Sequence, residues 1–261
     1  MLKALTVIML LQLAVIVSLN WLTPPTTAFM LQNDAEWVVQ ETVGVEHVSR
    51  NFLAAVLIHE DVDLPYRFLA FDVDEFWDRT ATYLRGEPDE SGSTIPQQLA
   101  KNLFLTPEQD GVRKGLEAGL AMELSVLVSD ARILELYVNV AQFGPNLYGV
   151  CAASWYYFGT PPDTIELSQA AQLVGLLPSP LHVRRGPSGG LDFDVPDGSG
   201  ELSAKHVWRA EEQVPYWFER TGGWQPVWDL GIEGFAQDQP DTDDDCSEMP
   251  AEVADLIAAQ Q

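Results

Sequence analysis

An acidic pair, Glu60-Asp61, has residue types that could carry out acid–base chemistry. It directly follows the apolar run 52–58. A positioned carboxylate acting as a general base typically contributes about 10²–10⁴-fold to a reaction rate. Taken alone, Glu60 could equally be a solvated helix residue. His59 beside two acids also suggests a metal ligand, but the sequence contains no His-Glu-x-x-His motif, and no structural zinc site is expected.

A second stretch, Arg113-Lys114-Gly-Leu-Glu117, combines two cations with a carboxylate. Residues three and four apart lie on the same face of a helix, so these three charges would crowd together. Cations placed in this way could stabilise the negative charge that develops on a departing phosphate group. Arg suits this task because its guanidinium can bind a phosphate through two hydrogen bonds. The alternative is a surface ion pair between Arg113 and Glu117, worth about 0.3–0.5 kcal/mol.

A third stretch, Ser91-Gly-Ser-Thr-Ile-Pro-Gln-Gln-Leu-Ala-Lys-Asn102, leads from small polar residues into a helix. Pro96 is compatible with the first helical turn, where backbone N–H groups lack intrahelical partners. Its glutamines could contact a ligand or simply satisfy nearby backbone groups. A fourth stretch, Arg132-Ile-Leu-Glu-Leu-Tyr-Val-Asn139, follows. The chain has 14 basic residues, and four of them lie in or beside these stretches: Lys101, Arg113, Lys114 and Arg132.

Helices are the elements expected to position these residues. Leucines at 116, 120, 124 and 127 follow helical spacing, and Ser129-Asp130 could cap a second helix. Two more helices are expected near 149–157 and 168–177, the latter ended by Pro178. The segment 184–201 is rich in Gly, Pro, Ser and Asp and is predicted to be a long loop. Two-residue alternation of strand length is scarce, so the fold class is mainly α.

The four stretches together resemble the glycosyltransferase module of peptidoglycan synthases. This module stands alone in monofunctional transglycosylases and opens the class A penicillin-binding proteins. The resemblance runs from about Ala54 to Pro180. It rests on Glu-Asp, Gly-Ser-Thr-Ile-x-Gln-Gln-Leu-Ala-Lys-Asn, Arg-Lys-x-x-Glu and Ile-Leu-Glu-x-Tyr-x-Asn in this order, and on the later Leu177-Pro178-Ser179-Pro180.

The resemblance implies a lysozyme-like glycosyltransferase domain with a smaller membrane-associated lobe. Glu60 would be the general base that takes the proton from the 4-hydroxyl of the acceptor N-acetylglucosamine, and Glu117 the second catalytic glutamate. The hydroxyl would attack the anomeric carbon of the lipid-linked growing chain and release undecaprenyl pyrophosphate, so that lipid II is polymerised into β-1,4-linked glycan strands. The residues expected to bind substrate are Asp61, Ser93, Thr94, Gln97, Gln98, Lys101, Asn102, Arg113, Lys114 and Arg132.

Some positions depart from the family pattern. After Glu60-Asp61 the stretch 62–67 replaces the usual Phe, His and Gly and has one extra residue. Two alternatives therefore remain open. A lytic transglycosylase would share the fold and use one glutamate, and Glu90-Ser91 resembles the Glu-Ser of that class. A degenerate membrane-bound scaffold would bind glycan without catalysis.

No organic cofactor is expected. A divalent cation, Mg²⁺ or Mn²⁺, is compatible with a pyrophosphate substrate, and Asp61 is a candidate ligand although no metal site is assigned. The partners implied are lipid II, the lipid-linked glycan strand and the cytoplasmic membrane, with cell-wall synthesis or division proteins as further candidates. The formal net charge of −25 argues against a nucleic-acid partner.

The N-terminal stretch from Ala4 to Leu22 contains 19 residues without a charge, which is about the length of a membrane-spanning helix. A cleaved signal peptide is the alternative, but its apolar region is usually only about 7–15 residues long. Lys3 precedes the stretch and the next cation is Arg50. This asymmetry predicts a single-pass anchor with the N-terminus in the cytoplasm and the rest of the chain outside. The resemblance implies that the membrane is the bacterial inner membrane, with the catalytic domain on its periplasmic side.

The predicted organisation is an anchor (1–23), a linker (24–45), a glycosyltransferase domain (46–236) and an acidic disordered tail (237–261). The tail prediction rests on eight acidic residues and no Lys or Arg between Asp238 and Asp255. Cys151 falls in an apolar run and Cys246 in the tail, so two free thiols are favoured over a disulfide.

Overall fold

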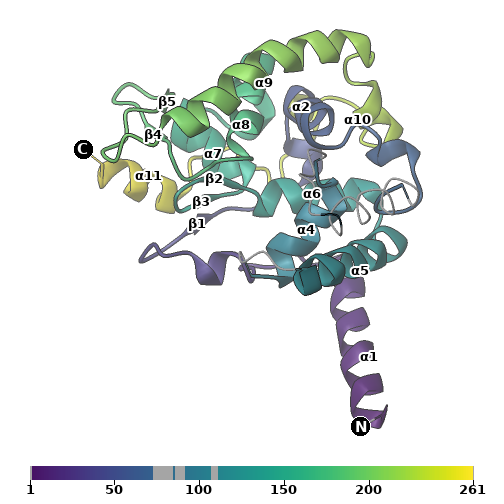
Figure 1. Ribbon diagram of the computed structural model, residues 1–261. Coiled ribbons are helices and arrows are strands. Elements are labelled where there is room, and N and C mark those ends of the chain that lie inside the picture. Colours follow the sequence, from purple (N-terminus) through teal and green to yellow (C-terminus); the bar gives the residue numbers. More distant parts are fainter. Residues whose placement is uncertain (1, 73–84, 86–91, 107–110, 261) are drawn as a thin grey trace.

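Helices make up most of the computed structural model, which describes residues 2–72, 85, 92–106 and 111–260 and confirms the mainly α class (Figure 1). The helices are α1 (Leu2–Ser18), α2 (Arg50–Glu60), α4 (Ile95–Phe104), α5 (Gly111–Leu127), α6 (Asp130–Val140), α7 (Val150–Phe158), α8 (Leu167–Leu176), α9 (Glu201–Arg220), α10 (Gln225–Asp229) and α11 (Ala251–Ala258). The strands are β1 (Val39–Gln40), β2 (Gln142–Gly144), β3 (Leu147–Tyr148), β4 (Arg184–Arg185) and β5 (Leu191–Asp192). Single turns of 3₁₀ helix are η1 (Met30–Gln32), η2 (Val45–His47), η3 (Leu64–Tyr66), η4 (Pro162–Thr164) and η5 (Ala236–Asp238).

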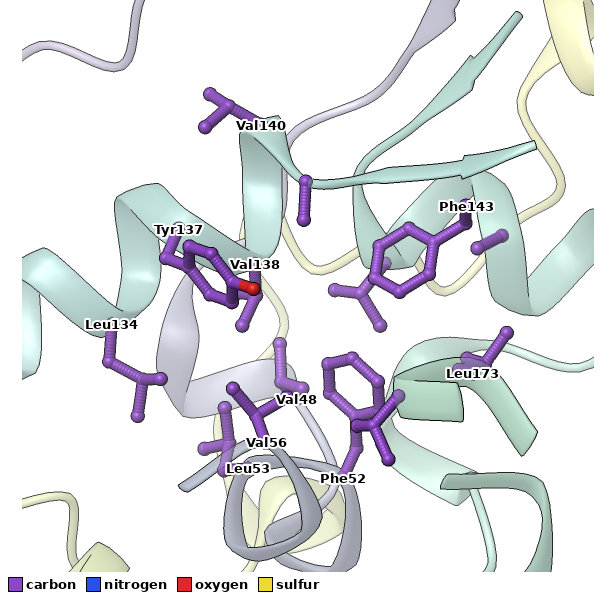
Figure 2. Packing of buried hydrophobic residues seen from close by; sticks show 14 of the residues in the cluster. Val48, Phe52, Leu53, Val56, Leu134, Tyr137, Val138, Val140, Phe143 and Leu173 are labelled. Carbon is purple, nitrogen blue, oxygen red and sulfur yellow. The ribbon is translucent and has the colours of Figure 1, made fainter. Parts of the chain in front are cut away.

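Helix α2 lies at the centre of the core and ends at Glu60. It packs against α8, α9 and α10, so the residues from Phe52 to Leu57 are all buried. The ring of Phe52 lies 6.1 Å from that of Phe143. Figure 2 shows Leu53 and Val56 on the same side of the cluster as residues of α6. Removing so much apolar surface from water holds the C-terminal end of α2, and with it Glu60, in a fixed place.

Helices α4, α5 and α6 pack against one another and carry the other predicted motifs. The helices expected near 116–127, after Ser129, near 149–157 and near 168–177 correspond to α5, α6, α7 and α8. Ser129 accepts a hydrogen bond from the N–H of Arg132, as expected for a helix cap. The segment 184–201 contains the short hairpin of β4 and β5 within an otherwise irregular stretch.

The sequence analysis did not predict α9, the longest of the described helices. Its buried residues, Ser203, Ala204, Val207, Ala210 and Val214, follow helical spacing and face α8 and α2. The approach to α8 is close because Gly175 has no side chain. A Cβ there would lie 2.5 Å from the Cα of Val207.

The prediction of a disordered tail is wrong. Residues 237–260 follow a defined course that includes η5 and α11, with Val253 and Leu256 buried. The prediction of two free thiols is also wrong. Cys151 of α7 and Cys246 form a disulfide with their Cα atoms 6.1 Å apart. The acidic side chains are mostly exposed, so their charge does not prevent a few apolar residues and one covalent bond from fixing the segment.

Helix α1 projects from the body, and its C-terminal part packs on α5 (Figure 1). Ile16 and Leu19 are buried there, and Asn20 donates a hydrogen bond to the carbonyl of Leu127 at 2.9 Å. The residues from Val7 to Leu11 are exposed. Among the described residues, no helix combines the length and the apolar character that crossing a membrane requires.

Candidate active site

Glu60 ends α2 with its side chain only 11% exposed. The Nε2 amide of Gln98 donates to its Oε2 at 2.5 Å, and the Nδ1 of His59 lies 2.7 Å from its Oε1. Both carboxylate oxygens therefore have a polar neighbour that fixes their direction. A carboxylate held in this way is suited to accept a proton from a ligand hydroxyl.

Asp61 joins the end of α2 to the start of α4. It forms a two-pronged ion pair with the guanidinium of Arg67, and its Oδ2 accepts the backbone N–H of Ile95 at 2.9 Å. The N–H of Ile95 belongs to the first turn of α4, where N–H groups lack intrahelical acceptors. The sequence analysis did not single out Arg67, which lies within the stretch that departs from the family pattern.

This geometry does not fit Asp61 as a cation ligand. Both of its oxygens already accept hydrogen bonds from Arg67, and a guanidinium so close disfavours a second positive charge. Within the described ranges, no group of three or more His, Cys, Asp or Glu side chains is arranged to hold a metal ion. The divalent cation stays a prediction, and no step is derived through it.

The start of α4 is organised by its own side chains. Thr94 is the N-cap, and the Oε1 of Gln97 accepts the backbone N–H of Thr94 at 3.0 Å in a capping box. Gln97 is thus explained by helix capping, one of the two interpretations that the sequence left open. Gln98 instead points toward Glu60, and its Nε2 also donates to the carbonyl of Ser93 at 3.0 Å.

Tyr137 extends the polar chain behind Glu60. Its hydroxyl donates to the Oε1 of Gln98 at 3.1 Å, so Gln98 links the phenol to the carboxylate. Burial, together with the nearby charges of Glu60 and Asp61, raises the pKa of Tyr137 well above its usual value, so the phenol stays protonated. Tyr137 belongs to the Ile-Leu-Glu-x-Tyr-x-Asn motif, which was the signal that could have identified it.

Glu117 is 2% exposed, which excludes the surface ion pair that the sequence left open. Its Oε2 lies 3.5 Å from the Nη1 of Arg113, and its Oε1 pairs with the ammonium of Lys114. Lys114 also donates to the hydroxyl of Ser93 at 3.1 Å. The buried carboxylate therefore gathers two cations on the side of α5 that faces the start of α4.

Lys101 and Asn102 line a pocket of about 200 Å³ beside the chain from Gln98 to Tyr137. Its other walls are Phe29, Val140, Ala141, Gln142, Leu177, Pro178, Pro180 and Leu181. Burial lowers the pKa of Lys101, and the cations Lys114 and Arg113 add to this effect, while Glu117 and Glu60 oppose it. The Lys101 ammonium gives this wall of the pocket a positive charge, which can attract an anionic group.

Arg132 does not join the other predicted binding residues. Its guanidinium donates to the carbonyl of Leu19 at 2.8 Å and to the hydroxyl of Thr23 at 3.0 Å, and it pairs with Glu135. These contacts attach the segment after α1 to α6. The observed contacts of Arg132 are therefore structural.

Comparison with known proteins places this arrangement in a family. The transglycosylase family model matches residues 28–188, which is more than half of the chain.

The chain belongs to the transglycosylase family.

Individual relatives agree. The chain is 43% identical over 163 residues to the biosynthetic peptidoglycan transglycosylase of Shewanella frigidimarina, covering 62% of this chain and 71% of that protein. It is 43% identical over 157 residues to the protein of that name from Marinomonas sp., covering 60% and 68%. It is 37% identical over 187 residues to the protein of that name from Acinetobacter baumannii, covering 67% of this chain and 81% of that protein.

These matches confirm the predicted family and its class of activity, glycosyl transfer. They do not test the role of any individual residue, so Glu60, Glu117 and the binding residues stay predictions supported by the geometry above. Glu90-Ser91, on which the lytic alternative depended, lies outside the described residues. The transglycosylase match also ends before α9, so the segment 189–261 lies beyond the part that defines the family.

Proposed function

We propose that this transglycosylase is a monofunctional peptidoglycan glycosyltransferase that polymerises lipid II for bacterial cell-wall synthesis. The proposal rests on one observation, that a carboxylate and an ammonium both lie beside Gln98. The carboxylate of Glu60 is held by Gln98, and the ammonium of Lys101 lines the pocket beside Gln98. A base for a sugar hydroxyl and a cation for a pyrophosphate leaving group are the two requirements of this reaction.

Glu60 acts as the general base. It takes the proton of the 4-hydroxyl of the acceptor N-acetylglucosamine while that oxygen forms a bond to the anomeric carbon of the lipid-linked growing chain. The bond from that carbon to the pyrophosphate breaks, and its electron pair leaves with undecaprenyl pyrophosphate. His59 and Gln98 keep the carboxylate of Glu60 oriented for the transfer.

The cations of α4 and α5 stabilise the leaving group. Lys114, which is 46% exposed in its side chain, and Lys101 are available to a pyrophosphate, whereas Glu117 is buried and serves to hold Arg113 and Lys114 in place. Ser93 and Asn102 add neutral polar contacts beside these cations. Glu117 is thus a positioning residue in this proposal.

The membrane is the proposed location of the lipid-linked substrate and of the enzyme. The exposed apolar residues of α1, from Val7 to Leu11, are accompanied by Val112, Leu116 and Val126 on the exposed side of α5. We propose that α1 anchors the protein in the inner membrane and that this side of α5 contributes to a membrane-associated lobe of a lysozyme-like domain. The disulfide favours the oxidising, periplasmic side for the catalytic domain.

Polymerisation of labelled lipid II by the detergent-solubilised protein tests the proposal. The expected product is a ladder of glycan strands that lysozyme digests, together with release of undecaprenyl pyrophosphate. Matched reactions contain either a chelator or added Mg²⁺ and Mn²⁺, which also decides the open question of the cation. Binding of glycan strands without any ladder would favour the scaffold alternative, and cleavage of preformed strands would favour the lytic one.

A further inference from the structure

The segment 27–30 lies beside the pocket, and Phe29 lines it, although the sequence analysis assigned these residues to a linker. The N–H of Ala28 donates to the carbonyl of Leu103 at 3.1 Å, and the N–H of Phe29 donates to that of Asn102 at 3.2 Å. These carbonyls lie in the last turn of α4, where the C=O groups of a helix lack N–H donors from the helix itself. The segment 27–30 therefore caps the C-terminal end of α4.

The capping segment is itself rigidly held. Thr27 and Met30 are both buried, and the N–H of Met30 donates to the hydroxyl of Thr27 at 3.1 Å. Phe29 lies between them and is half-buried. The backbone that carries the ring is thus held by hydrogen bonds from Ala28, Phe29 and Met30.

The ring of Phe29 forms one wall of the pocket and faces the catalytic cation. The ammonium of Lys101 lies 5.7 Å from the centre of the ring, which is within the range of a cation–π interaction. Among the described residues, no carboxylate lies within ion-pair distance of this ammonium. Glu60 and Glu117 act on it from α2 and α5 at longer range, and Arg113 and Lys114 oppose them. Phe29 is therefore the described side chain that holds the ammonium directly.

We propose that Phe29 is a positioning residue for glycosyl transfer, which holds the Lys101 ammonium over its ring and toward the pyrophosphate of the lipid-linked substrate. This inference rests on the proposed function. It assigns a role in the reaction to the segment that follows the N-terminal helix. The negative face of the ring stabilises the cation without neutralising it, so the full charge remains available to the leaving group.

The test compares Phe29→Leu with Phe29→Tyr and with the control Leu31→Ala, because Leu31 is close in sequence but 75% exposed. Leucine keeps an apolar contact but lacks the ring face. We expect kcat of Phe29→Leu to fall about three- to thirtyfold, the range of a cation–π interaction, with a smaller change in KM. Tyrosine restores the ring and should restore kcat. Thermal unfolding of the variants separates this effect from loss of the fold.

A pH profile reports on Lys101 itself. Loss of the ring removes a contact that favours the protonated form, so the pKa of Lys101, already lowered by burial, should fall further. The alkaline limb of kcat should then move to lower pH in Phe29→Leu. A measurement without turnover is the pH dependence of acetylation of Lys101, followed by mass spectrometry with the exposed Lys205 as the internal reference.

The outcomes separate the two proposals. Wild-type protein that makes no glycan strands overturns the proposed function, whatever the acetylation of Lys101 shows. An active wild type with kcat and pH profile unchanged in Phe29→Leu overturns the role of Phe29 alone. A shift in acetylation without any loss of kcat also overturns it, because the ring would then act on Lys101 but not on the reaction.

Discussion

Both carboxylate oxygens of Glu60 have polar neighbours, Gln98 and His59. A glutamine at this position has only one side-chain oxygen and cannot accept a proton as a base, so this substitution is informative. Glu60→Gln keeps the volume but removes the base, so the rate should fall by about two to four decades. Polymerisation of lipid II gives this rate, and circular dichroism checks the fold. The matched control is Glu123→Gln, because Glu123 also accepts from a glutamine amide, that of Gln12, at 2.7 Å. Near-normal turnover in Glu60→Gln would exclude it as the base.

At the scale of residues, the sequence could predict which side chains matter but not what each one contacts. The motifs led to Glu60, Gln98 and Lys114, which the structure links through hydrogen bonds and the neighbouring Ser93. The use of Arg132 to hold the segment after α1 could not be predicted, because no local pattern indicates a contact across 113 residues.

The partners of Asp61 were hidden for the same reason. An acidic residue beside the expected site of a pyrophosphate substrate suggested a metal ligand, whereas in the structure Asp61 binds Arg67 and the first turn of α4. The one sequence signal for a different role of Asp61 was that residues 62–67, which include Arg67, depart from the family pattern. Only the fold shows that this departure brings an arginine back to Asp61.

At the scale of elements, Asp61 links α2 to α4 and should contribute to stability. Asp61→Asn removes the negative charge that holds Arg67 and weakens the acceptor for Ile95. Hydrogen bonds to charged groups typically contribute about 1.5–3 kcal/mol, and we expect a loss of this size in the free energy of unfolding. Urea unfolding measures it. Asp63→Asn, an exposed neighbour without a capping hydrogen bond, should change stability by less than about 0.5 kcal/mol.

The helices that could be predicted are those whose signals lie in short local windows, namely the apolar spacing of α5 and the Ser129 cap of α6. The sequence analysis missed α9 although its buried residues follow helical spacing, because a long irregular stretch precedes it, Pro215 lies inside it, and small residues make up much of its buried face. Its position depends on Gly175 of α8, whose missing side chain lets the two helices approach. Such complementarity between distant residues has no signature in a single sequence.

At the scale of the whole molecule, the disulfide fixes the C-terminal segment to the core. Cys151 and Cys246 are 95 residues apart, and closing a loop of this size typically stabilises a protein by about 2–4 kcal/mol. The double variant Cys151→Ala/Cys246→Ala should lose a free energy of unfolding in this range, measured by urea unfolding. A reductant should destabilise the wild type to the same extent and leave the double variant unchanged. Equal sensitivity of both proteins to reductant would exclude the disulfide as the cause.

Local hydrogen bonds reinforce this covalent attachment. The indole of Trp155 donates to the carbonyl of Cys246 at 3.0 Å, and the N–H of Gly44 donates to the carbonyl of Asp244 at 3.1 Å. Composition alone predicted disorder here because it counts charges and cannot show that a few buried groups suffice to order a segment.

The contacts of residues 19–30 connect α1 to the pocket through a segment that is held against the body of the protein. Leu19 and Thr23 are held by Arg132, Asn20 by the end of α5, and Ala28 and Phe29 by the end of α4. With α1 in the bilayer as proposed, these contacts form a rigid connection between the membrane helix and the pocket rather than a flexible linker. The pocket then stays at a constant distance from the membrane surface. Lipid-linked sugars, which diffuse laterally in the membrane, can therefore reach it by lateral diffusion alone.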